Sequence, residues 1–255
     1  MSQDHEVDLL VIGAGPVGLF AAYYAGFRGL SVAVVDSLPE LGGQITAMYP
    51  EKEILDVAGF PSVKGKELVA GLVAQAATAN PTYFLGRTAR TLDLDGGGEE
   101  VRVGLDDGIV VTARAVIITA GIGKFTPRPL PAAADWPGDE IAFFVPSLAE
   151  YAGKDVLVVG GGDSAFDWAL ALRGIASSVT MVHRREAFRA HQATVDKVLA
   201  CDTQVITSAN VARLVGGGSG LEAVEVEHVK TGEVTVVKAQ AVIAALGFVA
   251  DLGPI

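Results

Sequence analysis

The stretch that most constrains the fold is residues 7–36, VDLLVIGAGPVGLFAAYYAGFRGLSVAVVD. It opens on a predominantly apolar run without polar alternation, which favours a strand buried on both faces of a parallel sheet. The turn GAGPVG follows at once, then a helical segment rich in alanine and aromatic residues, and then a second apolar strand that ends at Asp36. This order of strand, glycine turn, helix, strand and acid is typical of a dinucleotide-binding βαβ unit. A purely structural glycine turn is the alternative.

The residues of this unit have separate expected roles. Gly13 permits the tight turn, Gly15 lets the backbone approach a pyrophosphate, and Gly18 lets the helix pack close to the strand. The helix begins beside the turn, so its free N–H groups and positive dipole end face the phosphates. The acid stands about 20 residues further on, where a carboxylate can accept hydrogen bonds from a ribose. We therefore expect a dinucleotide to be bound by Gly13, Gly15, Pro16, Gly18 and Asp36.

Composition limits the class of protein. The 255 residues, half of them hydrophobic, suffice for one large or two ordinary α/β domains. The single cysteine, Cys201, leaves no intrachain disulfide or CxxC pair in this sequence and suits a reducing cytoplasm. The net charge of −11 argues against nucleic-acid binding and against adhesion to anionic membranes. Residues 9–27 are nearly uncharged, but their acidic flank and Gly-Pro turn are unlike a signal peptide or a membrane span.

The same plan is repeated in the second half of the chain. An apolar strand at 155–159 precedes GGGDSA (160–165), which opens a helix, and a second strand is predicted at 178–182. Strand-like segments with turn residues follow each βαβ segment, with glycine turns at 96–98 and 216–218. The sequence therefore predicts an α/β fold of two Rossmann-like nucleotide-binding domains, each a βαβ unit followed by a β-meander.

The two copies differ where the nucleotide is selected. The negative charge of Asp36 repels a 2′-phosphate and suits the unphosphorylated ribose of FAD, whereas the second copy continues into HRREAFR (183–189). Guanidinium groups pair with phosphate oxygens, so this end favours NADPH over NADH. The alternatives are a solvated basic strand end, an ordinary loop histidine at His183, and helix capping by Asp163 and Ser164. The residues expected to bind NADPH are Gly160, Gly162, Asp163, Ser164, Ala165, His183, Arg184, Arg185 and Arg189.

Three further segments carry local predictions. Glycines and prolines punctuate 37–60, which predicts a long loop, and long loops in compact domains are usually functional. In that loop Gln44 and Tyr49 can reach a planar ring with an amide and a phenol, or they are ordinary surface residues. Residues 65–80 predict an amphipathic helix, and residues 115–119 predict a buried strand.

Five segments together resemble the ferredoxin (or flavodoxin)–NADP reductases of the thioredoxin-reductase-like type: IGAGPVGLFAAYYAGFRGLSVAVVDS, LGGQITAMYPEKEILDVAGFP, ITAGIGKFTPRPL, VVGGGDSAFDWAL and HRREAFRAH. The resemblance implies hydride transfer from NADPH to FAD, single-electron transfer to ferredoxin or flavodoxin, and a homodimer. It also implies FAD contacts at Asp36, Gln44, Tyr49, Ala89 and Phe125. We expect no catalytic side chain and no metal, because the redox chemistry belongs to the cofactors.

The resemblance places an FAD-binding domain at 1–123, with 246–255 as the start of its return segment, and an NADPH-binding domain at 124–245. In this family the chain continues past such a strand and supplies a Gly-Asp turn and a tail that covers the flavin. No such segment follows here, so we expect an incomplete first domain. Two alternatives remain open, an NADPH-binding module without flavin activity and an NADPH-dependent flavin or quinone reductase. Thioredoxin-reductase chemistry is not expected, because 143–148 reads FFVPSL and Cys201 has no partner.

Overall fold

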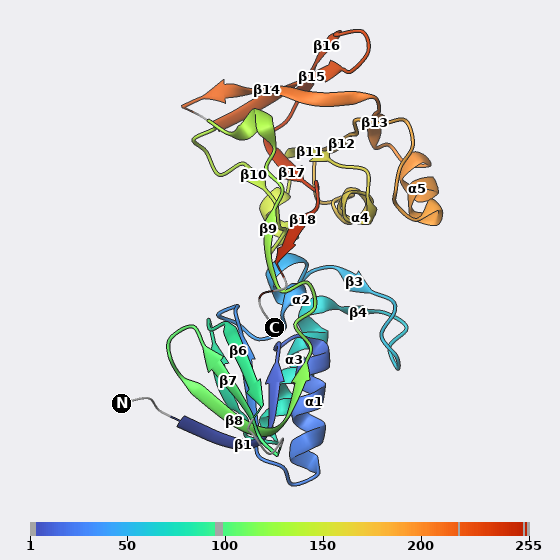
Figure 1. The fold of residues 1–255 in the computed structure, drawn as a ribbon. Coiled ribbons are helices and arrows are strands. Elements are labelled where there is room, and N and C mark those ends of the chain that lie inside the picture. The colour runs from blue at the N-terminus through green and yellow to red at the C-terminus, as the bar shows by residue number, and fades with distance from the viewer. Residues whose placement is uncertain (1–3, 95–98, 219, 252, 254–255) are drawn as a thin grey trace. The chain divides into compact units, whose positions relative to one another are not determined.

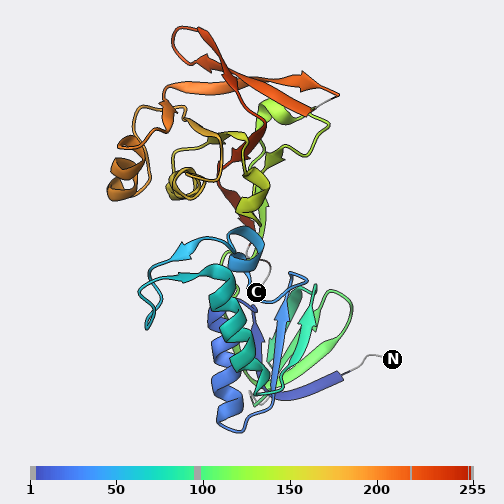
Figure 2. The same ribbon diagram turned by 180° about the vertical axis from the view of Figure 1, so that it is seen from behind.

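The computed structural model describes residues 4–94, 99–218, 220–251 and 253. The chain divides into two compact units, which are shown in Figures 1 and 2. The first unit comprises residues 1–126 and 250–255, and the second comprises residues 127–249.

The first unit is built on a six-stranded sheet in the order β5-β2-β1-β8-β7-β6 (Figure 1). Its strands are β1 (Asp4–Ile12), β2 (Val32–Asp36), β5 (Thr82–Leu85), β6 (Ala89–Leu94), β7 (Val101–Leu105) and β8 (Val110–Ile118). The first four in that order run parallel, and β7 and β6 add an antiparallel ladder. Alternate residues of β1 enter two different cores, with Val11 packing in one and Leu10 in the other. Both are fully buried, which explains the apolar run without polar alternation.

Helices cover one face of this sheet (Figure 2). Helix α1 (Pro16–Phe27) has proline at its first position, where the missing N–H costs nothing, and α3 (Gly65–Ala77) packs against α1. The predicted loop 37–60 contains the short helix α2 (Gln44–Met48) and strand β3 (Glu53–Ile54), which pairs with β4 (Val63–Lys64). The loop prediction is therefore wrong for these residues.

Strand β8 corrects a second expectation. The strand-like segment just before residue 115 and the predicted strand 115–119 form one continuous strand, β8, whose first half pairs with both β1 and β7. Among the described residues, the half from Ala115 to Ile118 pairs with β1 alone. The side chains of Ile117 and Ile118 are 41% and 53% exposed. The apolar composition of this segment predicted a buried strand. The prediction failed because composition does not reveal how many neighbouring strands a strand has. The glycine turn expected at 96–98 lies outside the described residues.

The second unit repeats the arrangement. Its parallel sheet has the order β10-β17-β11-β12-β13, and a three-stranded antiparallel sheet, β14-β15-β16, follows. The parallel strands are β10 (Ile141–Ala142), β11 (Asp155–Val159), β12 (Ser178–Val182), β13 (Gln204–Ile206) and β17 (Ala241–Ala244). The other elements are β14 (Ala209–Gly217), β15 (Gly220–His228), β16 (Val234–Lys238), α4 (Asp163–Ala171), α5 (Gln192–Leu199) and the 3₁₀ turns η1 (Pro131–Ala133) and η2 (Leu148–Tyr151). One core joins the two sheets, with Leu157 and Val242 packed in the same cluster as Val224.

The two-domain Rossmann-like prediction is confirmed by this architecture. The chain passes between its units on β9 (Lys124–Pro127) and β18 (Phe248–Asp251), which pair in a two-stranded sheet. No helix in the described parts of the chain is both long and apolar enough to cross a membrane.

Candidate nucleotide-binding sites

The glycine loop of the first unit lies at the carboxyl end of β1. Gly13 has a φ of 110°, and a Cβ added there would lie 2.5 Å from the carbonyl oxygen of Thr119. A Cβ on Gly18 would lie 1.8 Å from the carbonyl oxygen of Gly13. The expected roles of Gly13 in the tight turn and of Gly18 in close packing are therefore confirmed. At Gly15, by contrast, an added Cβ meets nothing within 4 Å, so the loop backbone faces open space there.

The carboxylate of Asp36 binds the protein's own backbone. Its Oδ2 accepts a hydrogen bond from the Ala14 amide at 2.6 Å, and its Oδ1 accepts one from the Leu38 amide at 2.8 Å. The acid thus connects the glycine loop to the turn that follows β2. An ionised carboxylate offers about four lone-pair sites, so acceptor capacity for a ribose remains. Sequence reasoning assigned Asp36 to the ribose and missed this structural role.

A cavity of about 400 Å³ opens beside this loop, within the first unit. Eight of the nine residues expected to bind FAD line it, and they are Gly13, Gly15, Pro16, Asp36, Gln44, Tyr49, Ala89 and Phe125. Gln44 and Tyr49 come from the two ends of α2. The ninth, Gly18, is buried in α1. The open backbone at Gly15 and the polar groups around the cavity fit a dinucleotide.

Burial affects the ionisation of Tyr49. It raises the pKa of the Tyr49 hydroxyl above its ordinary value, although the Lys52 charge opposes this shift. The Lys52 ammonium lies 5.7 Å from the centre of the Tyr49 ring, within the range of a cation–π contact. The phenol is therefore neutral at physiological pH and can donate a hydrogen bond.

The same cavity is lined by two arginines that the sequence analysis did not single out, Arg87 and Arg90. In the sheet register Leu85 lies opposite Asp36, and the Arg87 amide donates to the Asp36 carbonyl oxygen at 3.0 Å. The sequence signal was an arginine two residues beyond a short strand. That signal becomes informative only once β5 is known to pair with β2.

The second glycine loop lies at the carboxyl end of β11. Gly160 has a φ of 155°, and an added Cβ would lie 2.5 Å from the carbonyl oxygen of Ala245. At Gly162 an added Cβ meets nothing within 4 Å, as at the corresponding open position of the first loop. A Cβ on Gly161 would lie 2.4 Å from the His183 ring, so the imidazole packs directly on the loop.

The basic segment after β12 folds back over this loop. The Arg189 amide donates to the Gly161 carbonyl oxygen at 2.8 Å. The side chains of Arg184, Arg185 and Arg189 are exposed, and within the described residues none of them forms an ion pair. Burial lowers the pKa of His183, and the three arginine charges lower it further, while a hydrogen bond with the Ala187 carbonyl opposes them.

The structure corrects the capping alternative for Asp163 and Ser164. The residue at the N-cap of α4 is Gly162, and no side chain caps the helix. The Asp163 carboxylate instead accepts a hydrogen bond from the His191 amide at 2.8 Å, which helps to hold the basic segment in place. Ser164 is exposed at the loop. Ala165 is fully buried and its amide donates to the Gly162 carbonyl oxygen at 3.0 Å, so it supports the loop from beneath.

Comparisons with known proteins agree with this geometry. The family model described as pyridine nucleotide-disulphide oxidoreductase matches residues 7–253. A ferredoxin–NADP reductase of Nocardioides sp. is 68% identical over 252 residues, which are 98% of this chain and 76% of that protein. A ferredoxin–NADP reductase of Saccharopolyspora erythraea is 61% identical over 98% of this chain and 76% of its own length. A crystal structure of T. acidophilum thioredoxin reductase is alike in fold, with a TM-score of 0.80 and 24% identity over 96% of this chain and 78% of the other.

The two glycine loops and these matches define an oxidoreductase of the class that uses FAD and a pyridine nucleotide. The chain belongs to the pyridine nucleotide-disulphide oxidoreductase family and, within it, to the ferredoxin–NADP reductases. The cofactors of this family are FAD and NADPH, as the sequence analysis expected. The resemblance stated from the five sequence segments is therefore confirmed.

Proposed function

We propose that the chain oxidises NADPH and passes the electrons through FAD to a one-electron carrier, a ferredoxin or a flavodoxin. When bound, FAD accepts a hydride and releases its electrons singly, and the protein binds and orients both cofactors. The observation that carries this proposal is that an acid stands beside the first glycine loop, whereas arginines stand beside the second. The first unit has Asp36 bonded to its loop, and the second has the Arg189 segment folded over its loop. The names of the relatives, which are ferredoxin–NADP reductases, support ferredoxin as the carrier.

We assign FAD to residues 1–123 with 246–255. The open backbone at Gly15 receives the pyrophosphate, Asp36 accepts from the ribose, and Gln44 donates from its amide to the isoalloxazine ring. Tyr49 and Phe125 line the same cavity and contact the flavin or its attachment. The negative charge of Asp36 at the ribose position disfavours a nucleotide with a 2′-phosphate.

We assign NADPH to residues 124–245. The open backbone at Gly162 receives its pyrophosphate, with the amide groups at the start of α4 facing the charge. Arg184, Arg185 and Arg189 pair with the 2′-phosphate, because guanidinium groups offer several donors to phosphate oxygens. The neutral ring of His183 supports the loop from the side.

We also propose that the chain forms a homodimer in the cytoplasm. Support for self-association comes from α1, where the exposed fractions of Phe20, Tyr24 and Phe27 are 51%, 51% and 69%. These rings stack along the helix, and Val17 extends the same apolar surface. Exposed apolar surface of this kind marks interaction sites on proteins. Light scattering of the purified chain measures the oligomeric state, and a monomer at all concentrations contradicts this part of the proposal.

A visible spectrum tests the central proposal. The purified chain should be yellow after incubation with FAD, and anaerobic NADPH should bleach it. Added ferredoxin or flavodoxin should then carry electrons to a reporter haem protein. A colourless chain that still binds NADPH supports the binding-module alternative. Bleaching without any carrier-dependent reduction of the reporter supports a flavin or quinone reductase.

A further inference from the structure

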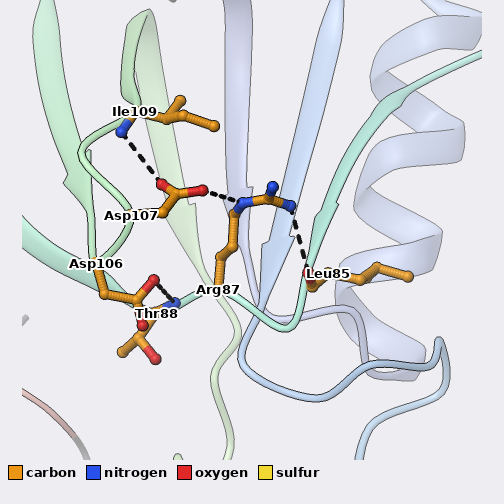
Figure 3. Close-up of polar contacts among 6 residues, drawn as sticks. All are labelled: Leu85, Arg87, Thr88, Asp106, Asp107 and Ile109. Atoms are coloured by element: carbon orange, nitrogen blue, oxygen red, sulfur yellow. Dashed lines mark hydrogen bonds and ion pairs between the residues drawn. The ribbon is translucent and has the colours of Figure 1, made fainter. Parts of the chain in front are cut away.

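The guanidinium of Arg87 is fixed in place beside the cavity of the first unit. Figure 3 shows it held between the Asp107 carboxylate and the backbone of Leu85. Its Nε donates to Asp107, and its Nη1 donates to the Leu85 carbonyl oxygen at 3.5 Å. The side chain is 37% exposed, so most of its surface is covered. A long side chain held at two points loses little further freedom when it meets a ligand.

The residues that hold Arg87 are themselves held. Oδ1 of Asp107 accepts from the Ile109 amide at 3.1 Å, which leaves Oδ2 for Arg87. Beside it, the Thr88 amide donates to Asp106 Oδ1 at 3.1 Å (Figure 3). The Asp106 amide donates back to the Thr88 carbonyl oxygen at 3.0 Å. Hydrogen bonds therefore join the turn between β7 and β8 to the segment after β5. This connection fixes the position of the guanidinium relative to the sheet.

The position of Arg87 along the cavity indicates which part of a dinucleotide it meets. Its amide donates to the carbonyl oxygen of Asp36, and it lines the same cavity as Gly15 and Ala89. In a nucleotide with its pyrophosphate at Gly15 and its ribose at Asp36, the base lies beyond the ribose, on the side away from the pyrophosphate. This position of the base is at the ends of β2 and β5, where Arg87 lies.

The chemistry of the free donors suits a purine. A guanidinium has five N–H donors, and two of those of Arg87 are engaged. The remaining donors match the ring nitrogens of adenine, and a guanidinium plane also stacks on an aromatic face. Flavins without an adenosine half offer no such group at this end of the cavity.

We propose that Arg87, positioned by Asp107, contacts the adenine of FAD and makes the first unit select FAD over flavins that lack the adenosine half. This inference rests on the proposed assignment of FAD to the first unit. Arg87 is a specificity-determining residue, and Asp107 is a positioning residue that acts through it.

The test measures FAD binding to the apoprotein by fluorescence and absorbance. AMP and FMN are then added as competitors for the same site. AMP carries the adenosine half of FAD, and FMN carries the flavin half. Arg87→Gln should raise the Kd of FAD and the competition constant of AMP about tenfold, and should leave the constant of FMN within about twofold. Asp107→Asn should shift both adenosine-dependent constants in the same direction by a smaller factor, with FMN again unchanged. Arg87→Lys keeps the charge but lacks the planar fork, and should fall between Arg87→Gln and the wild type.

Arg114→Gln is the matched control, because this arginine also forms an ion pair, with Asp8, but does not line the cavity. Melting curves of every variant separate folding defects from binding defects. If Arg87→Gln fails to fold, Arg87→Lys and Asp107→Asn decide the question. The inference is overturned if the folded Arg87 variants bind FAD as tightly as the wild type, or if they weaken FMN as much as AMP. A wild-type chain that binds neither FAD nor AMP overturns instead the assignment of FAD to this unit.

Discussion

The Oδ2 atom of Asp36 accepts a hydrogen bond of 2.6 Å from the backbone amide of Ala14, so the acid at the end of β2 holds the glycine loop. Its other oxygen accepts from the Leu38 amide. An asparagine in this place presents an NH₂ group to one of the two amides, and that amide loses its acceptor. We therefore expect Asp36→Asn to lower the free energy of unfolding of the apoprotein by roughly 1–3 kcal/mol.

Urea unfolding without any nucleotide measures this effect. Glu40→Gln is the control, because Glu40 is an exposed acid close by in the chain and forms no hydrogen bond with the described residues. If the stability of Asp36→Asn equals that of the control, the acid serves only the ligand and does not hold the loop.

The glycines of the first loop separate folding from binding. A Cβ on Gly18 would lie 1.8 Å from the Gly13 carbonyl oxygen, a contact with backbone that no side-chain rotation relieves. A Cβ on Gly15 meets nothing within 4 Å. Gly18→Ala should therefore destabilise the apoprotein by at least about 1–3 kcal/mol, the usual cost of overpacking. Gly15→Ala should fold as well as the wild type and lose FAD affinity, because its methyl group occupies the space of the pyrophosphate.

Thermal melting and FAD titration of the two variants check this pair. Equal FAD affinity in Gly15→Ala and the wild type would place the pyrophosphate elsewhere. Normal stability in Gly18→Ala would mean that α1 can move away from β1 at little cost.

The glycine motifs and the repeated apolar runs were sufficient to predict two Rossmann-like units, because strand burial and tight turns are local demands on the sequence. Tertiary partners were not predictable in the same way. The donors that occupy both oxygens of Asp36 come from two separate turns, and the anchor of Arg87 comes from a turn between two other strands. The capping alternative for Asp163 failed for the same reason, since its carboxylate binds an amide 28 residues away in the chain. The burial predicted for Ile118 failed because strand burial depends on how many neighbours a strand has.

The imidazole of His183 makes stability depend on pH. Burial and the neighbouring arginines lower its pKa in the folded state below its ordinary value of 6.5. Between these two pKa values the unfolded chain binds more protons than the folded chain, so acid favours unfolding. The contribution of His183 is fully present above the unfolded pKa and is lost as the pH falls through the lowered pKa.

Urea unfolding between pH 8 and pH 5 should therefore show a smaller loss of stability in His183→Gln than in the wild type. His191→Gln, which changes an exposed histidine of the same segment, is the control substitution. Each substitution leaves every carboxyl group in place, so the difference between the curves reports the histidine that was replaced. Parallel curves for His183→Gln and the wild type would show that this ring does not sense pH.

The arginines on the second loop should set the choice of coenzyme. The backbone of Arg189 is fixed to Gly161, and the exposed side chains of Arg184 and Arg189 are free of ion pairs with the described residues. Removal of each guanidinium should cost about 1.5–3 kcal/mol of binding to a 2′-phosphate, which is about tenfold or more in the KM for NADPH. NADH lacks that phosphate, so its KM should remain close to that of the wild type. Steady-state oxidation of each coenzyme, with an added electron acceptor that reoxidises the flavin, measures both values in Arg184→Ala, Arg189→Ala and the double variant. Arg173→Ala removes an exposed arginine of the same unit that pairs with Asp202, and it should change neither KM. Equal weakening for NADPH and NADH would mean that the arginines support the loop without contacting the phosphate.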